Sequence, residues 1–66
     1  MDANKIKVNI AGTVYTIIGE KTKTEVEDIA NFVDEEIKKI TSQNYLLNST
    51  MAATLVALNV SSDYFD

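Results

Sequence analysis

The residues best suited to acid–base chemistry in this sequence are the neighbouring carboxylates Asp34 and Glu35. In a helix, adjacent residues project about 100° apart, so these two carboxylates do not face a common substrate. Each is followed four residues later by a lysine, Lys38 or Lys39, at the spacing of a helical ion pair. We therefore interpret the acidic pair as a solvated, salt-bridged helix surface and not as a catalytic site.

Other kinds of chemical site lack the residues that they need. The chain has no cysteine and no histidine, so it has neither a thiolate nucleophile nor the commonest zinc and iron ligand. Gly12 and Gly19 are isolated, unlike the clustered glycines of a phosphate-binding loop, and we assign them to a turn and a strand end. Tyr15 is assigned to the core. The sequence predicts a protein that is not an enzyme and has no cofactor or metal site.

The charge and hydropathy of the chain argue against two classes of partner. Ten acidic and six basic side chains give a formal net charge of −4, whereas phosphate binding relies on clustered lysine and arginine. No stretch approaches the roughly 20 apolar residues that span a bilayer. Residues 1–5 also lack the basic segment and apolar run of a leader. We expect a cytoplasmic protein that binds neither nucleic acid nor membrane.

Residues 5–18 contain two stretches of alternating apolar and polar residues, separated by Ala11-Gly12. This pattern predicts an antiparallel β-hairpin in which Gly12 adopts a positive φ. A two-residue turn pairs Ile10 with Thr13 and collects one apolar face that must be covered, consisting of Ile6, Val8, Ile10, Tyr15 and Ile17. Because alanine is a poor first residue for such a turn, a slightly longer loop is the alternative.

The opposite face of this hairpin carries the lysines Lys5 and Lys7 beside Asn9 and Thr16. Lysines on an edge strand protect it against aggregation, and this is the simpler interpretation. The same two lysines are also candidate contacts for an acidic partner. Both interpretations place them on a solvent-facing surface.

A helix is predicted after the second strand, where Thr22 or Thr24 is followed three residues later by Glu25 or Glu27 at the spacing of a capping box. Apolar residues then recur every three or four positions over about four turns, namely Val26, Ile29, Ala30, Val33, Ile37 and Ile40. Acidic residues near its start and the two lysines near its end complement the helix dipole. Residues 42–44 (Ser-Gln-Asn) predict its end.

Asn48-Ser49-Thr50 predicts the cap of a second helix that runs from about Thr50 to the end of the chain. A stripe with alternating four- and three-residue spacing forms a heptad-like seam, consisting of Met51, Leu55, Leu58, Ser62 and Phe65. The roughly opposite side is also apolar, with Ala53, Ala57, Val60 and Tyr64. A helix that is apolar nearly all round is buried. One side can pack on the hairpin and the first helix, so the other predicts a second chain.

These elements predict an α+β fold of a β-hairpin followed by two helices (ββαα), in a single domain. Residues 1–48 form the hairpin and helix head, and residues 49–66 begin a truncated dimerisation helix. The helical pattern reaches Asp66 without a capping glycine or a basic last turn, so we expect this helix to continue as a coiled coil in a longer protein.

A chain of 66 residues buries only about 60% of its unfolded surface, and association with a second copy is one remedy. We predict a homodimer whose interface contains Met51, Leu55, Leu58, Asn59, Ser62 and Phe65. Asn59 is either a buried polar residue that fixes the register of the two helices or a half-exposed residue beside the seam. Leu58→Asp is expected to abolish dimerisation.

The order and spacing of several short segments resemble the ZapA family of bacterial cell-division proteins. These segments are residues 10–17 (IAGTVYTI), Gly19, Val33-Asp34-Glu35 and residues 52–61 (AATLVALNVS). The resemblance implies a hairpin and helix head, followed by a long coiled-coil helix that dimerises and pairs further into tetramers. It also implies binding to the tubulin-like division protein FtsZ, lateral linking of FtsZ protofilaments, and stabilisation of the division ring at midcell. No FtsZ-contacting motif of the family can be placed on this sequence residue by residue.

Two function hypotheses follow. The first is a ZapA-like accessory protein of the division ring, in which two identical FtsZ-binding faces are held across one two-fold interface. The second is a small regulatory adaptor or antitoxin-like module that acts as a homodimer and captures one partner. Only the first predicts that FtsZ filaments are bundled.

Overall fold

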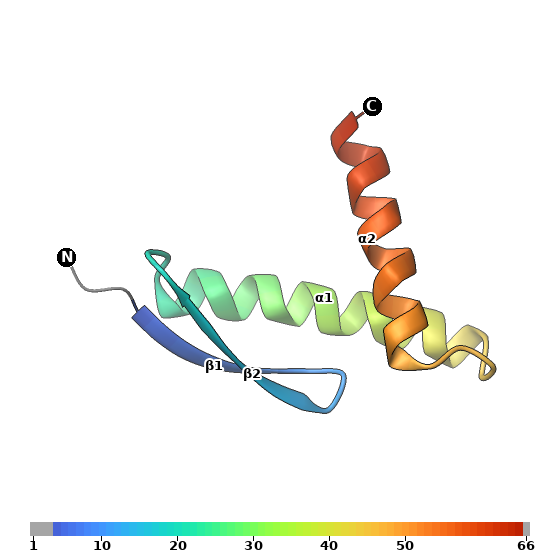
Figure 1. The fold of residues 1–66 in the computed structure, drawn as a ribbon, viewed down its shortest axis with the longest axis horizontal. Helices are drawn as coiled ribbons and strands as arrows, with labels where there is room; N and C mark the ends of the chain where they lie inside the picture. Colours follow the sequence, from blue (N-terminus) through green and yellow to red (C-terminus); the bar gives the residue numbers. More distant parts are fainter. Residues whose placement is uncertain (1–3, 66) are drawn as a thin grey trace.

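A computed structural model describes residues 4–65 of the chain. Residues 1–3 and Asp66 lie outside the described part. The expectation that the last helix continues through Asp66 therefore also falls outside the described residues. The elements follow one another as β1 (Asn4–Ile10), β2 (Thr13–Gly19), α1 (Lys23–Gln43) and α2 (Ser49–Phe65) (Figure 1). The predicted ββαα arrangement is confirmed.

β1 and β2 form an antiparallel hairpin with a two-residue turn, and Ile10 is paired with Thr13 as predicted. The turn residues Ala11 and Gly12 have φ values of 54° and 84°, both in the left-handed region that this type of turn requires. A positive φ is unfavourable for alanine. The Ala11 N–H donates a 2.7 Å hydrogen bond to Oδ1 of Asp34 on α1, which stabilises this conformation.

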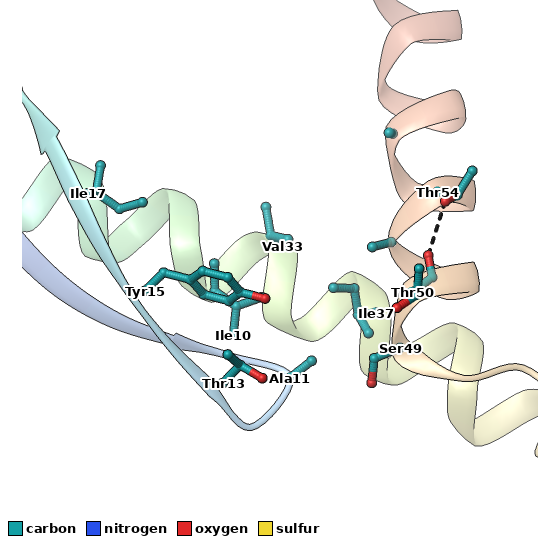
Figure 2. A pocket seen from close by; sticks show the side chains of 12 residues that line it. Ile10, Ala11, Thr13, Tyr15, Ile17, Val33, Ile37, Ser49, Thr50 and Thr54 are labelled. Carbon is teal, nitrogen blue, oxygen red and sulfur yellow. Dashed lines mark hydrogen bonds between the residues drawn. The ribbon is translucent and has the colours of Figure 1, made fainter.

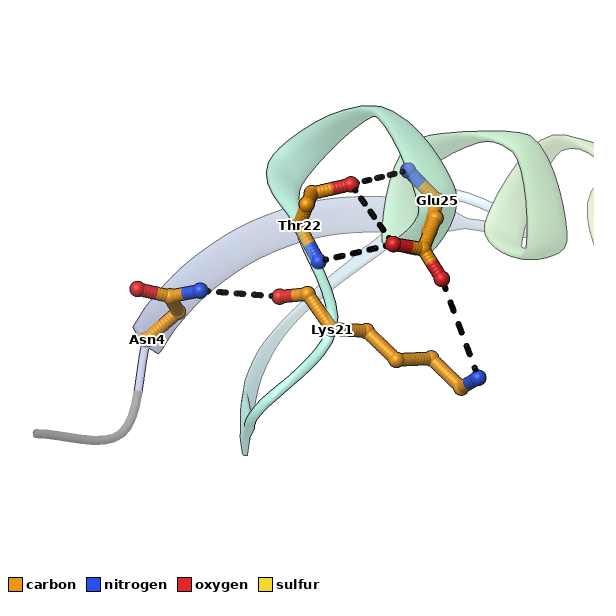
Figure 3. Close-up of polar contacts among 4 residues, drawn as sticks. All are labelled: Asn4, Lys21, Thr22 and Glu25. Atoms are coloured by element: carbon orange, nitrogen blue, oxygen red, sulfur yellow. Dashed lines mark hydrogen bonds and ion pairs between the residues drawn. The ribbon is translucent and has the colours of Figure 1, made fainter. Parts of the chain in front are cut away.

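α1 begins at a complete capping box (Figure 3). The Glu25 N–H donates to the Thr22 hydroxyl over 3.2 Å, and the Glu25 carboxylate accepts from the Thr22 N–H over 3.4 Å. This selects Thr22 over Thr24 as the cap. The Asn4 side chain donates to the Lys21 carbonyl over 2.9 Å, so the start of the hairpin and the start of α1 are tied together. At the other end, Asn44 caps the helix, and no basic residue lies in its last turn.

The described core consists of two small clusters, one at each end of α1. In the first, α1 covers β1 through Val26 and Ala30, which pack on Ile6 and Val8. In the second, Ile37 packs on Ala52 and Val56 of α2. Ile29, predicted to belong to the apolar stripe of α1, is 52% exposed and lies at the margin of the covered face.

The molecule is thin and extended for its length. Its principal extents are 43 × 31 × 15 Å, and the shortest is little more than the 10–12 Å diameter of one helix with its side chains. The Cα radius of gyration is 13.3 Å, whereas a compact domain of this length has about 11 Å. α2 rises steeply from one end of α1 and projects away from the hairpin (Figure 1). Much of its surface therefore has no cover within the chain.

Candidate functional site

An open apolar groove lies between the hairpin, α1 and α2, with a volume of about 690 Å³ (Figure 2). β2 contributes Tyr15 and Ile17, α1 contributes Val33, and α2 contributes the small residues Ala53 and Ala57. The polar members of its lining are serine, threonine and tyrosine, and none of the described lining residues carries a charge. The groove is suited to an apolar helix or strand and not to a charged substrate.

β2 forms an open wall of this groove because α1 covers the other strand. α1 packs on β1 and buries Ile6 and Val8. On the same face of the hairpin, Tyr15 is 49% exposed and Ile17 is 39% exposed. The expectations that this whole face is covered and that Tyr15 belongs to the core are wrong for the single chain. Alternation along the strands identifies an apolar face, but the width of the covering helix decides how much of it is buried.

α2 contacts α1 through a narrow strip that belongs to neither of the two stripes predicted for it. Ala52 has no exposed surface, Val56 is buried, and both pack on Ile37. The prediction that one of the two stripes packs on the hairpin and α1 is therefore corrected. Alanine at the crossing point lets the two helices approach closely. Sequence reasoning missed this strip because it gave weight to large apolar residues, and an alanine-rich segment is the signal that points to it.

The seam predicted from the sequence lies on the outer side of α2, away from the groove. Its exposed members include Leu55 at 39% and Leu58 at 61%, and all six predicted interface residues are exposed in the single chain, namely Met51, Leu55, Leu58, Asn59, Ser62 and Phe65. Within the chain they therefore form no core. Ala53 and Ala57 of the opposite stripe line the groove, whereas Val60 and Tyr64 of that stripe are exposed farther along α2. α2 therefore presents apolar residues on two sides at once.

Asp34 connects the hairpin turn to α1. Its Oδ1 accepts the Ala11 N–H over 2.7 Å, and its Oδ2 lies 2.8 Å from Nζ of Lys38. The ion pair with Lys38 and the hydrogen bond from Ala11 hold the pKa of Asp34 below its usual value, and the same ion pair raises the pKa of Lys38. The predicted pairing of Asp34 with Lys38 is confirmed, but its side chain also positions the hairpin tip beside the groove.

The second predicted ion pair differs from the structure. Nζ of Lys39 lies 2.8 Å from a carboxylate oxygen of Glu36, three residues earlier, in place of Glu35. The Glu36 carboxylate raises the pKa of Lys39. Three- and four-residue separations both bring side chains together on a helix surface, so sequence spacing alone does not choose between the two glutamates.

The candidate partner-binding residues Lys5 and Lys7 lie exposed on the outer face of the hairpin. They pair across the strands with Ile18 and Thr16 respectively. Ile18 and the nearby Val14 are more than half exposed, so the lysine ammonium groups stand beside apolar surface. This face lies on the other side of the sheet from the groove, because successive side chains of a strand alternate between its two faces.

The described residues hold no arrangement typical of a catalytic centre. Among residues 4–65 there is no cluster of three or more side chains suited to bind a metal ion. In the same part of the chain, no side-chain nitrogen or oxygen is both buried and without a hydrogen-bond partner. Nor does any helix there have the length and apolar character needed to cross a membrane. The exposed apolar residues and the apolar groove of the described part instead fit contacts with other protein chains.

Known proteins similar to this chain are consistent with such a role. The family model described as "Cell division protein ZapA" matches residues 6–66. A Bacillus pumilus cell division protein ZapA is 40% identical over 60 residues, covering 91% of this chain and 71% of that protein. The ZapA of Bacillus subtilis is 35% identical over 60 residues, with the same coverage of both chains.

A solved structure has the same fold. It is described as a ZapA mutant dimer from Geobacillus stearothermophilus, and its chain is 26% identical to this one. The two chains superpose with a TM-score of 0.81, covering 98% of this chain and 76% of the other. Together with the family match over nearly the whole sequence, this similarity leads to one conclusion. The chain belongs to the ZapA family of non-enzymatic cell-division proteins.

Proposed function

We propose that this chain acts as a homodimer that binds FtsZ and links its protofilaments laterally, and so stabilises the division ring at midcell in the cytoplasm. Membership of the ZapA family supports this proposal, as does the dimer of the similar protein from Geobacillus stearothermophilus. The observation that carries it is the thin shape of the chain, in which α2 leaves apolar residues exposed on two sides. Exposed apolar surface of this extent is typical of a protein interface.

Pairing two copies supplies the mechanism. A dimer presents two identical partner-binding faces at a fixed separation, so one dimer contacts two neighbouring filaments. After the first contact, the second is intramolecular and benefits from a high effective concentration. Individually weak contacts then suffice to bundle a polymer, and no cofactor is needed.

We assign the contact between copies to α2. Two of its sides qualify. One is the seam predicted from the sequence, with Met51, Leu55, Leu58, Asn59, Ser62 and Phe65. The other is the side that faces the groove, with Ala53 and Ala57. A two-fold axis brings the same face of both helices together, so each side defines a different dimer.

We assign the FtsZ contact to the outer face of the hairpin. Lys5 and Lys7 stand there beside exposed Val14 and Ile18. A partner surface with carboxylates around an apolar centre complements this arrangement, and its binding weakens as salt screens the charges. The hairpin is held to α1 by Asp34 and by the bond between Asn4 and Lys21, so this face is rigidly positioned.

Sedimentation of FtsZ filaments tests the function. Filaments assembled with this chain are expected to pellet as bundles together with it, at low centrifugal force. Lys7→Glu should reduce the pelleted amount by about tenfold at low salt, because it reverses one interface charge. Lys23→Glu, the same charge change in the first turn of α1, serves as the control and should leave pelleting unchanged.

Other outcomes of this experiment are informative. If Lys7→Glu and Lys23→Glu behave alike, the outer hairpin face is not the FtsZ contact. If the chain binds FtsZ without bundling it, the regulatory adaptor becomes the better description. A lack of any binding by a dimeric chain would contradict the proposed function.

A further inference from the structure

The free edge of β1 presents backbone groups that no other described segment pairs with. The two-residue turn makes Ile10 and Thr13 a hydrogen-bonded pair, and such pairs alternate with non-bonded pairs along an antiparallel hairpin. The N–H and C=O groups of Lys5, Lys7 and Asn9 therefore point away from β2. Within the described part of the chain, the backbone hydrogen bonds outside the regular elements lie at the ends of α1, in the loop after it and at the start of α2. None of them reaches this edge.

A strand edge of this kind is a template for one further strand. An extended peptide that adds to it satisfies the free N–H and C=O groups, and this main-chain pairing is a common mode of peptide recognition. The side chains of the added strand alternate between the two faces of the sheet. The protein side chains beside the edge on each face then decide which peptide fits.

On the outer face of the sheet, an added strand lies beside Lys5 and Lys7. Both lysines are exposed, and neither takes part in the ion pairs of the described residues. The third outer residue, Asn9, is engaged at the turn, where its Oδ1 accepts the Gly12 N–H over 3.1 Å. Opposite charges on directly facing residues stabilise a strand pair. The outer positions of the peptide therefore select acidic side chains.

On the inner face, the same edge borders a polar cleft of about 430 Å³ between β1 and α1. β1 lines it with Val8, among others, and α1 contributes Glu27, Asp28 and Asn31. Neither of these two carboxylates takes part in the ion pairs of the described residues. A peptide side chain facing Val8 enters this cleft, where the carboxylates select a basic group. The cleft shares no lining residue with the apolar groove and is a separate surface.

We propose that the edge of β1 binds an extended peptide segment of another protein, in which acidic residues alternate with basic or apolar ones. The peptide adds to the hairpin as a third strand. Its acidic residues lie beside Lys5 and Lys7, and a basic residue enters the cleft at Glu27. This inference goes beyond the proposed function, because it requires neither FtsZ nor a dimer.

A second hairpin is a poor occupant of this edge. Two β1 edges paired antiparallel around Lys7 would place the two Lys7 side chains opposite each other, and like charges in that position are destabilising. The lysines that repel a second hairpin attract an acidic strand. The edge of β2 lacks this selectivity, because its outward-pointing residues Val14, Thr16 and Ile18 carry no charge.

Amide hydrogen exchange of the full chain tests the proposal. The probe is a capped seven-residue peptide in which glutamates alternate with lysine and valine. In the free protein, the amides of Lys5, Lys7 and Asn9 should exchange rapidly. Saturating peptide should slow their exchange by more than tenfold, because each N–H then bonds to the added strand. The outward-pointing amides of β2 serve as the internal control and should not change. Protection at β2 in place of β1 would reject the assigned edge.

Two N-methylated forms of the peptide separate a backbone contact from a side-chain contact. The N–H groups of alternate residues in a strand point to the same side. Methylating either the glutamate amides or the lysine and valine amides therefore removes one set of N–H groups without changing the charge. Strand addition predicts that one form binds more than tenfold more weakly in fluorescence anisotropy, while the other binds like the unmodified peptide. Equal binding by the two forms would reject strand addition.

Charge substitutions test the selectivity. A peptide in which glutamate and lysine are exchanged should bind more than tenfold more weakly than the original. Glu27→Lys should weaken binding of the original peptide by about tenfold, because it reverses a charge in the cleft. Glu35→Lys makes the same change on α1 outside the cleft and is the control. Circular dichroism checks that both variants fold.

The remaining outcomes each contradict the proposal. Equal binding of the two charge patterns, or equal effects of the two variants, would reject the assigned charge complementarity. Tight binding of a peptide copied from residues 4–10 would make a second hairpin the occupant. If no peptide binds, strand addition at β1 is excluded, whereas the proposed function is still decided separately by the pelleting of FtsZ.

Discussion

The two helices of this chain contain similar kinds of apolar residues but use them differently. α1 places its apolar residues on one arc, and Val26, Ala30 and Ile37 on that arc are buried within the chain. α2 distributes its apolar residues around most of its circumference, and the chain buries only Ala52 and Val56 among its described residues. The apolar arc of α1 is buried within the chain at both ends of the helix, whereas most of the apolar surface of α2 stays exposed.

This difference shows that apolar content alone does not say where a helix is buried. α1 is flanked by the hairpin and by α2, so its single arc has a partner at each end. α2 crosses α1 near one end and then leaves the head, so its remaining faces have no intrachain neighbour (Figure 1). In this chain, α1 supplies buried contacts at both of its ends, and the uncovered faces of α2 are available for contacts with another chain.

The largest effect on stability is expected from removing the buried contact between α1 and α2. Ile37→Ala should lower the free energy of unfolding by about 2–5 kcal/mol, because it leaves a cavity against Ala52 and Val56. Ile29→Ala makes the same chemical change at a half-exposed site of the same helix and should cost less than about 1 kcal/mol. Urea unfolding at one fixed protein concentration measures both. Equal costs would mean that the contact between α1 and α2 does not organise the fold.

A smaller effect is expected at the start of α1. Thr22→Ala removes the hydroxyl that accepts the Glu25 N–H and should cost about 1 kcal/mol of stability. Thr24→Ala changes the same residue type inside the first turn, where no cap is lost, and should be near neutral. Thermal unfolding compares the two variants. A larger loss for Thr24→Ala would contradict the assignment of Thr22 as the cap.

The smallest expected effect is a loss of folding stability at acidic pH. The folded pKa of Asp34 lies below its usual value, so its contribution is fully present above about pH 4 and is lost as the pH falls through the folded pKa. Asp34→Asn should keep a hydrogen bond from Ala11 but remove this acid dependence. Glu35→Gln, next to it on the helix, is the control and should retain it. An unchanged acid profile for Asp34→Asn would exclude Asp34 as the group responsible.

Local patterns were sufficient to predict the elements and their order. The two alternating stretches around Ala11-Gly12 predict a hairpin and favour its register, since a slip by one residue would move every apolar side chain to the wrong face. The longer loop left open by Ala11 is excluded by the observed pairing of Ile10 with Thr13. The three-residue spacings of Thr22 with Glu25 and of Thr24 with Glu27 narrowed the start of α1 to two caps, and the structure selects Thr22. These features depend on neighbours within a few positions, and such neighbours are visible in the sequence.

Contacts between distant residues were predicted less well. The bond from the Ala11 N–H to Asp34 spans 23 positions and depends on how the turn meets α1. The burial of Ala52 depends on the crossing of two helices, and small side chains give little signal of their own. The exposure of Tyr15 depends on α1 covering β1 in place of β2. None of these outcomes follows from the spacing of apolar residues, because that spacing identifies an apolar face but not the segment that packs against it.

By itself, the sequence determined that this chain folds as ββαα and that its second helix has more apolar surface than a monomer of 66 residues can cover. Tertiary structure decided which strip of α2 is used internally and that an apolar groove opens beside it. The physical reason is that local propensity and apolar spacing act along the chain, whereas burial depends on which surfaces approach one another in space.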